Sequence, residues 1–299
     1  MSTVFGFIGF GEVASVLSEA ISEHGGRVVA TDVLLSQVGG EAILQERIRS
    51  GSAVLVSMND LVRESDIVLS TVTTMAALQV AEEVASRLRK GQNYVDLNST
   101  SPRVKMKIGV ALSLSAATFV EAAVLGAVGA TGARTRLLLC GKSANDMANL
   151  LNEYGLNATF YSETVGQAST FKMLRSIFSK GLEALILETL VAGRRAGIEE
   201  SLWGDITSFM ASKPFDVIAH NWTKSHGSAY ERRYHEMEQV LETMREVGVR
   251  PIMSEATAEL FRRSVRLNLA SRLRSAGDDL AHAVIDALVT GQDLLENEG

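Results

Sequence analysis

The chain opens with a glycine-rich stretch, VFGFIGFGEVAS, which runs from Val4 to Ser15. Its glycines, Gly6, Gly9 and Gly11, stand between apolar residues, although glycine weakens the interior of a strand. Their placement requires either a tight turn or another group that closely approaches the backbone. An apolar helical pattern starts at Val13, so the two later glycines fall at a turn from strand to helix.

The turn matches the fingerprint of a dinucleotide-binding site, with Gly9, Gly11 and Ala14 at the three small-residue positions. Gly9 allows the tight turn, Gly11 lets a pyrophosphate approach the backbone, and Ala14 permits close packing of helix on strand. A purely structural turn is the alternative. The second apolar run, RVVATD, favours the dinucleotide because it ends at Asp32, where a carboxylate would accept hydrogen bonds from an adenosine ribose.

The sequence favours NAD over NADP. Asp32 would repel a 2′-phosphate, and the following VLLSQVGG contains no arginine to bind one. The last predicted contacts, Thr71 and Val72, end the apolar run DIVLSTV. The complete set of predicted cofactor residues is Gly9, Phe10, Gly11, Glu12, Val13, Asp32, Thr71 and Val72.

Short β-branched runs alternate with helical patterns up to Ser162, which is typical of βαβ units. A long helical stretch follows from Gly166 to about Arg195, and only helical patterns come after it. We therefore predict an α/β fold. A Rossmann-type doubly wound parallel sheet would be followed by a long interdomain helix and an all-α C-terminal domain, with boundaries at 1–165 and 166–299.

Composition excludes several classes of partner. The formal net charge of −6 and the lack of a basic run argue against nucleic acid, and no apolar run reaches the ~18 residues of a membrane span. The single cysteine, Cys140, cannot form an internal disulfide and is expected to be buried, which fits a reducing cytoplasm. The histidines have no metal-ligand spacing, so no metal site is predicted.

Two loops that follow predicted strands offer substrate contacts. DLNSTSP supplies Asn98 and Ser99 at the ligand-binding edge, although capping of a helix by Ser101 ahead of Pro102 explains part of this motif without a substrate. EAAVLGAVGA contains Gly126, whose amide could bind an anion. A plain turn is an equally good explanation of that glycine.

The long helix carries a narrow polar stripe that includes Lys172, Arg175 and Ser176. The stripe becomes apolar again further along the helix, as expected of residues that line a cleft. Lys172 is therefore a candidate acid/base. Arg175 is predicted to anchor a substrate anion; the alternative is a structural ion pair with Glu183 or Glu121.

Four motifs in order make the chain similar to the β-hydroxyacid dehydrogenase family, which includes 3-hydroxyisobutyrate and 6-phosphogluconate dehydrogenases. GFIGFGEVA resembles the nucleotide motif of that family, DLNSTSP and EAAVLGA its substrate motifs, and GQASTFK its lysine motif. The resemblance implies a Rossmann domain, an interdomain helix and a helical domain that commonly drives dimerisation. It also implies that Lys172 is the acid/base.

Two positions depart from the family pattern. Leu125 replaces a serine, and Ser176 replaces an asparagine. The form KMLRS, together with AYERRYHEM, resembles a less characterised branch, so no substrate is inherited from the better-known members. Arg232 and Arg233 lie where relatives often place a basic residue near the site; a salt-bridged helix face is the alternative.

We therefore expect an NAD-dependent oxidoreductase that transfers hydride between a 3-hydroxy acid, with sugar acids among the candidates, and the nicotinamide. Lys172 would be the acid/base, and Asn98, Ser99, Gly126, Arg175 and Ser176 would bind the substrate. The expected partners are a small anionic hydroxy acid and a second copy of the chain, bound through the helical domain. An imine or ketone reductase on the same scaffold, and a non-catalytic NAD-sensing protein, remain open.

Overall fold

The computed structural model describes residues 2–274 and 279–296, with side chains as far as Gly291. The chain divides into two compact units, residues 1–177 and 178–299. The division falls inside the long helix α8 (Gln167–Arg195), and the boundary predicted at 165/166 lies just before this helix. Each unit is described by itself.

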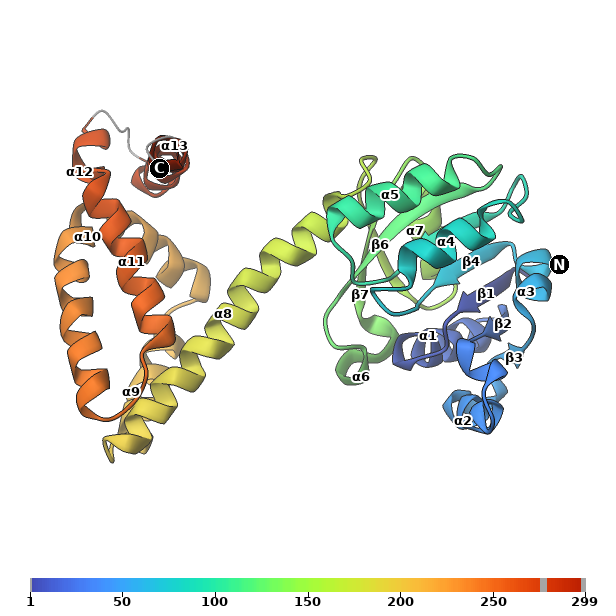
Figure 1. Cartoon of the computed structure of the whole chain (residues 1–299), viewed down its shortest axis with the longest axis horizontal. Helices are drawn as coiled ribbons and strands as arrows, with labels where there is room; N and C mark the ends of the chain where they lie inside the picture. The colour runs from blue at the N-terminus through green and yellow to red at the C-terminus, as the bar shows by residue number, and fades with distance from the viewer. Residues whose placement is uncertain (1, 275–278, 297–299) are drawn as a thin grey trace. The chain divides into compact units, whose positions relative to one another are not determined.

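Unit 1 is built on one eight-stranded sheet of order β3-β2-β1-β4-β5-β6-β7-β8. Figure 1 shows this sheet among its helices. Every pairing is parallel except β6 with β7. The strand order reverses between β1 and β4, as in a doubly wound sheet, which confirms the predicted Rossmann-type fold. The strands are β1 (Val4–Ile8), β2 (Arg27–Thr31), β3 (Val54–Leu55), β4 (Ile67–Ser70), β5 (Asn93–Asp96), β6 (Thr118–Leu125), β7 (Arg136–Cys140) and β8 (Asn157–Ser162).

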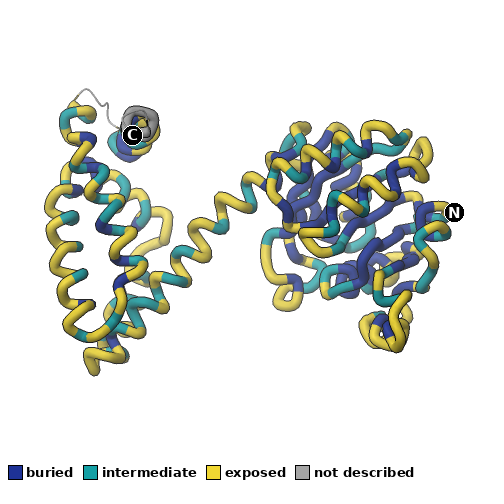
Figure 2. Tube along the Cα trace, viewed as in Figure 1, coloured by how far each residue is buried: buried dark blue, intermediate teal, exposed yellow. Residues whose placement is uncertain are grey.

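Helices cover both faces of the sheet, and the strands between them are almost wholly buried (Figure 2). Phe5 and Phe7 of β1 pack with Leu17 of α1 on one face, while Leu61 of α3 and Ile108 of α5 belong to the apolar layer on the other. The helices of unit 1 before α8 are α1 (Glu12–Glu23), α2 (Gly40–Arg47), α3 (Met58–Glu64), α4 (Ala77–Ala85), α5 (Pro102–Leu112), α6 (Val128–Thr131) and α7 (Ala144–Glu153), with 3₁₀ turns η1 (Val33–Ser36), η2 (Arg49–Gly51) and η3 (Gly132–Arg134).

The opening glycines have different structural causes. A β-carbon on Gly6 would lie 2.1 Å from Ser65 Oγ, so this glycine allows α3 to pack closely on β1. Gly9 has φ +86°, and a β-carbon there would lie 2.8 Å from the carbonyl oxygen of Thr71. Gly6 is thus required by packing, whereas Gly9 is required by both its backbone conformation and its neighbour.

Unit 2 is helical throughout its described residues, as predicted. Pro214 and Pro251 stand at the N-caps of α10 and α11, where helix starts were expected. A small buried cluster contains Tyr230, Leu269 and Val284. Besides the end of α8, the helices are α9 (Glu199–Ala211), α10 (Phe215–Glu246), α11 (Ile252–Arg266), α12 (Leu269–Arg272) and α13 (Leu280–Glu296).

Candidate active site

A cleft of about 1010 Å³ opens in unit 1 beyond the carboxyl ends of β1, β2 and β4, where the strand order reverses. Ligands of open α/β sheets bind at this kind of switch point. Residues of the predicted cofactor set that line the cleft are Gly9, Gly11, Asp32, Thr71 and Val72. Further lining residues include Val33, Leu35, Ser36, Arg47, Met58, Ala76 and Val80.

The glycine turn is open towards a ligand. Gly11 is the N-cap of α1, and no side chain caps the first turn of this helix. A β-carbon built on Gly11 would have no atom within 4 Å, so the space beside its backbone is free. Unpartnered amides at a helix start bind phosphate well. The turn therefore fits the pyrophosphate of a dinucleotide.

Asp32 connects the end of β2 to this turn. Its Oδ2 accepts a hydrogen bond from the backbone N–H of Phe10 at 2.7 Å, and its Oδ1 accepts one from Leu34 N–H at 2.9 Å. The carboxylate is thus held in place by the backbone, at the wall of the cleft where a ribose contact was predicted.

A residue outside the stretch used for the NAD prediction also bears on the choice between NAD and NADP. No arginine follows Asp32 in VLLSQVGG, but Arg47, at the end of α2, lines the same cleft. Its Nη1 donates to the carbonyl oxygen of Phe10 at 3.1 Å, and Ser15 Oγ donates to the carbonyl oxygen of Arg47 at 2.5 Å. Local sequence could not reveal this arginine because α2 must first fold back against the glycine turn.

Lys172 and Ser99 meet in unit 1. Lys172 Nζ donates to Ser99 Oγ at 2.5 Å, which joins the first turns of α8 to the loop after β5. Thr74 Oγ1 donates to the carbonyl oxygen of Ser99 at 3.2 Å, and the neighbouring Thr73 lines the cofactor cleft. The contact between lysine and serine therefore lies next to a wall of the cleft.

Glu121 of β6 fixes the start of α8. Its buried carboxylate accepts from Gly166 N–H at 2.5 Å and from Ser169 N–H at 2.7 Å, and Gly166 has φ +101°. A carboxylate at a helix N-terminus satisfies otherwise unpaired amides and interacts favourably with the helix dipole. This role has no signal in the local sequence because Glu121 lies 45 residues before Gly166, whose amide it binds.

Beneath Ser99 lies a buried ion pair between Lys105 Nζ and Asp96 Oδ1 at 2.5 Å, with side chains 1% and 0% exposed. Lys105 also donates to the carbonyl oxygens of Asp96 and Ala122. Asn98 Nδ2 donates to Asp96 Oδ2 at 2.8 Å and to Ser70 Oγ at 2.9 Å. Asn98, predicted to bind substrate, is thus held inside this network by its amide nitrogen.

Gly126 and Ser176, two further predicted substrate residues, take no part in the hydrogen bond between Lys172 and Ser99. Gly126, with φ +142°, follows β6 at the turn before α6. Ser176 Oγ donates to the carbonyl oxygen of Lys172 within α8.

Arg175 borders a separate hollow of about 440 Å³ with Tyr161 and Phe171. In the described part of the chain it forms no ion pair with Glu121 or Glu183.

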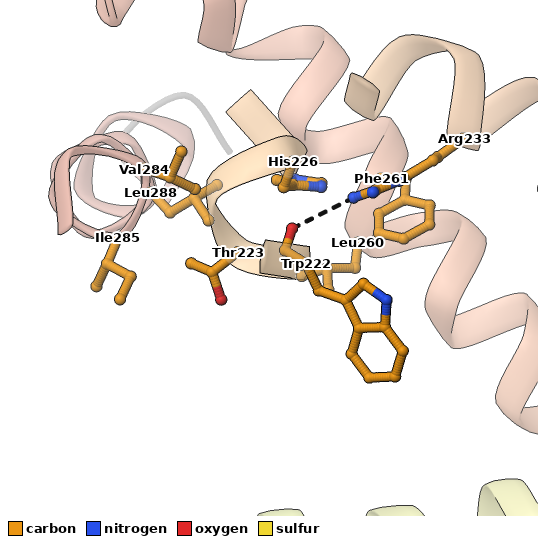
Figure 3. A pocket seen from close by; sticks show the side chains of 9 residues that line it. All are labelled: Trp222, Thr223, His226, Arg233, Leu260, Phe261, Val284, Ile285 and Leu288. Atoms are coloured by element: carbon orange, nitrogen blue, oxygen red, sulfur yellow. Dashed lines mark hydrogen bonds between the residues drawn. The ribbon is translucent and has the colours of Figure 1, made fainter. Parts of the chain in front are cut away.

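Unit 2 has an apolar hollow of about 470 Å³ (Figure 3). Arg233 lies at its edge and donates to the carbonyl oxygen of Trp222 at 3.4 Å and to Ser225 Oγ at 2.7 Å. His226 pairs with Ser264 Oγ at 2.9 Å; burial, and secondarily Arg233, lowers the pKa of this imidazole. Arg232 pairs with Glu236 on the surface of α10. Arg232 thus fits the alternative of a salt-bridged helix face, whereas Arg233 lines the hollow and bonds within α10.

Neither metal ligands nor membrane-spanning segments emerge from the described residues. Within 2–274 and 279–291, where side chains are described, His, Cys, Asp and Glu nowhere gather in threes as a metal site would need. None of the described helices is both long enough and apolar enough to cross a membrane.

Cys140 is buried in β7, as expected, and burial raises the pKa of its thiol to about 11, with a further contribution from Glu121.

Relatives with the same organisation have unassigned functions. An uncharacterized 28.5 kDa protein of Methanothermus fervidus is 30% identical over 259 residues, covering 86% of this chain and 97% of its own length. A solved structure of a conserved protein of unknown function, described as similar to 3-hydroxyacid dehydrogenases, is 32% identical. It covers 89% of this chain and 99% of its own, with a TM-score of 0.59.

Known enzymes are more distant. Mitochondrial 3-hydroxyisobutyrate dehydrogenase of Rattus norvegicus is 22% identical over 226 residues, covering 73% of this chain and 65% of the enzyme. An imine reductase from Pseudomonas sp. shares the fold with a TM-score of 0.72 at 16% identity, over 96% of this chain and 100% of its own.

Two family models match the chain. Residues 4–162 match the NAD binding domain of 6-phosphogluconate dehydrogenase, and residues 194–264 match a domain of unknown function, DUF1932. The first match covers more than half of the chain and confirms the family predicted from the four motifs. The chain therefore belongs to the family defined by the NAD binding domain of 6-phosphogluconate dehydrogenase, in a branch whose second domain has no assigned function.

Proposed function

We propose that the protein is an NAD-dependent dehydrogenase acting reversibly on a 3-hydroxy acid, with sugar acids among the candidate substrates. The observation that carries the proposal is the 2.5 Å contact between Lys172 Nζ and Ser99 Oγ, next to a wall of the dinucleotide cleft. An amine and a hydroxyl at this distance can hold the hydroxyl of a third molecule and exchange its proton.

The dinucleotide would be held by the amides of the glycine turn and by Asp32 at the adenosine ribose. When bound, its nicotinamide accepts a hydride from the substrate carbon or returns one to it. Lys172, as the neutral amine, would take the hydroxyl proton during oxidation and give it back during reduction. Ser99 would hold the substrate oxygen close to Nζ.

The remaining site residues would bind the substrate or position the groups that do. We assign Gly126 to the substrate through its backbone amide, Asn98 to positioning of the loop that carries Ser99, and Ser176 to the polar stripe near Lys172. Arg175 would anchor the substrate carboxylate through its planar guanidinium. Its exposure at a hollow is compatible with an incoming anion.

A substrate screen tests the proposal. Purified protein would be offered 3-hydroxy acids, sugar acids and their phosphates with NAD, and ketones with and without amines in the presence of NADH. Nicotinamide absorbance reports turnover in both directions. Oxidation of a hydroxy acid that is lost in Lys172→Ala supports the proposal. Amine-dependent reduction alone would favour an imine reductase, and binding without any turnover would favour an NAD-sensing protein.

We also propose a cytoplasmic homodimer formed through the helical unit. The single buried Cys140 fits a reducing compartment, and the unit 2 portion of α8 exposes a series of large apolar side chains. They are Phe178, Leu182, Leu185, Leu187 and Val191. Light scattering after size-exclusion chromatography is expected to give a dimer for the native chain and a monomer for Leu185→Asp. A monomeric native chain would contradict this assembly.

A further inference from the structure

We infer that Arg47 binds the 2′-phosphate on the adenosine ribose of NADP(H), so that the cleft takes this dinucleotide as well as NAD(H). The inference rests on the proposed dinucleotide site and adds a residue that determines its specificity. The arginine comes from outside VLLSQVGG, the stretch after Asp32 in which the sequence offers none.

The geometry begins at Phe10, between the two glycines of the turn. Its backbone N–H donates to Asp32 Oδ2 at 2.7 Å, and its carbonyl oxygen accepts from Arg47 Nη1 at 3.1 Å. Phe10 therefore links two side chains: the carboxylate of Asp32, which is predicted to contact the ribose, and the guanidinium of Arg47. Both Asp32 and Arg47 line the cleft.

Both ends of Arg47 are held. Ser15 Oγ of α1 donates to its carbonyl oxygen, which ties the end of α2 to the first turns of α1, while Phe10 holds the guanidinium. An arginine fixed in this way loses less conformational entropy when it binds a ligand. The arrangement is thus suited to binding as well as to bracing the turn.

The charges near Asp32 are more favourable for a 2′-phosphate on the ribose than the sequence around Asp32 alone indicates. Each oxygen of the Asp32 carboxylate accepts a backbone N–H, which offsets part of its negative charge. Across the described residues, Arg47 has no acidic side chain within 4.0 Å, whereas Arg49, two residues later, pairs with Glu19 at 3.5 Å. A guanidinium that lines a nucleotide cleft without an acidic partner is suited to a phosphate.

A contact of Arg47 with the pyrophosphate is the competing assignment. The open amides at the start of α1 would serve that group, and Arg47 shares a hydrogen-bond partner, Phe10, with Asp32, the residue assigned to the ribose. The two assignments differ in one consequence. A pyrophosphate contact would affect NADH and NADPH equally, whereas a 2′-phosphate contact would affect NADPH alone.

The test measures binding, not turnover. NADH and NADPH would be titrated into the native chain, Arg47→Ala, Arg47→Lys and the control Arg49→Ala, with the nicotinamide fluorescence as the signal. Calorimetry with 5′-AMP and 2′,5′-ADP would isolate the adenosine end. We expect Arg47→Ala to raise the Kd for NADPH and for 2′,5′-ADP about tenfold or more, and to leave the Kd for NADH and 5′-AMP within about twofold. Arg47→Lys should fall between, and Arg49→Ala should match the native chain.

Three results would overturn the inference: failure of the native chain to bind NADPH, an equal loss of both dinucleotides in Arg47→Ala, or no loss at all. In each case, NADH binding by the native chain would leave the proposed dinucleotide function standing. If neither dinucleotide binds, the inference and the proposed function fail together. The NADH titration of the native chain therefore separates the two failures.

Discussion

The two units differ in how completely they bury their apolar side chains. In unit 1 the strands are covered on both faces, and buried polar groups such as Asp96 and Glu121 have specific partners. In unit 2 the described buried cluster is small, and α8 to α11 expose many large apolar side chains. Unit 1 thus buries its apolar side chains within its own core, whereas unit 2 leaves more of its large apolar side chains exposed.

The units also share one device, a distant carboxylate at a helix start. Glu121 caps α8 in unit 1 from inside the sheet, fully buried. Glu188 of α8 caps α11 in unit 2, where it accepts from the N–H groups of Met253 and Ser254, both at 2.8 Å, and from Ser254 Oγ. The same kind of helix cap can therefore be removed in two environments, one fully buried and one partly exposed. Both tryptophans, Trp203 and Trp222, lie in unit 2, so tryptophan fluorescence follows the unfolding of unit 2 alone.

The largest expected effect is on the stability of unit 1. Lys105→Met leaves the carboxylate of Asp96 buried without its cation, and breaking a buried ion pair in this way costs about 3–5 kcal/mol. Denaturant unfolding followed by circular dichroism should show the loss, while tryptophan fluorescence should report little change in unit 2. Lys107→Met, at an exposed position on the same helix, is the control. Equal stability of the two variants would contradict the assigned role of the pair.

The next effect is on chemistry within unit 1. With a substrate identified, Lys172→Ala should lower kcat about 100-fold or more, because proton transfer loses its amine. The Kd for NADH should stay within about twofold, since Lys172 is assigned to the substrate. Stopped-flow turnover and NADH titration measure the two quantities, with Lys180→Ala, an exposed lysine of the same helix, as the control. Near-normal turnover would remove Lys172 from the mechanism.

Within unit 1, local sequence patterns could be predicted, but contacts that form only on folding could not. The strands, the glycine turn, Asp32 and the long helix have local patterns, so the fold and the cofactor cleft could be predicted. Arg47 and Glu121 bond to partners 37 and 45 residues away, and Lys105 bonds across elements to Asp96 at the end of β5. Arg47 reaches the glycine turn only after α2 folds back, and the partner of Lys105 is chosen by packing inside the sheet. Periodicity and motif spacing contain no information on such pairings.

Removing the cap in unit 1 is expected to have a smaller effect than breaking the ion pair. Glu121→Gln can accept only one of the two backbone N–H groups, so one buried donor stays unpaired at a cost of about 1–3 kcal/mol. Because the cap fixes the first turn of α8, kcat should also fall through displacement of Lys172. Unfolding by circular dichroism and turnover measure these effects, with exposed Glu163→Gln as the control. A stability loss with unchanged kcat would show that the cap does not position the lysine.

The smallest effect is expected at the matching cap in unit 2. Burial alone would raise the pKa of Glu188, but the hydrogen bonds from Met253, Ser254 and Ile252 outweigh it and lower this pKa below its ordinary value. A carboxyl with a lowered folded-state pKa stabilises the fold above its unfolded pKa and loses that contribution as pH falls through the folded one. Glu188→Gln should therefore cost about 1 kcal/mol near neutral pH and progressively less under acid conditions.

Tryptophan fluorescence, measured during denaturant unfolding at a series of pH values, follows this change in unit 2 directly. Exposed Glu200→Gln is the control, and its difference from the native chain should be small at every pH. A Glu188→Gln difference that grows as the pH falls would reverse the sign of the linkage and refute the lowered pKa. A cost as large as that of Glu121→Gln would show instead that burial of the carboxylate does not set the strength of the two caps, because Glu188 is only partly buried and Glu121 is fully so.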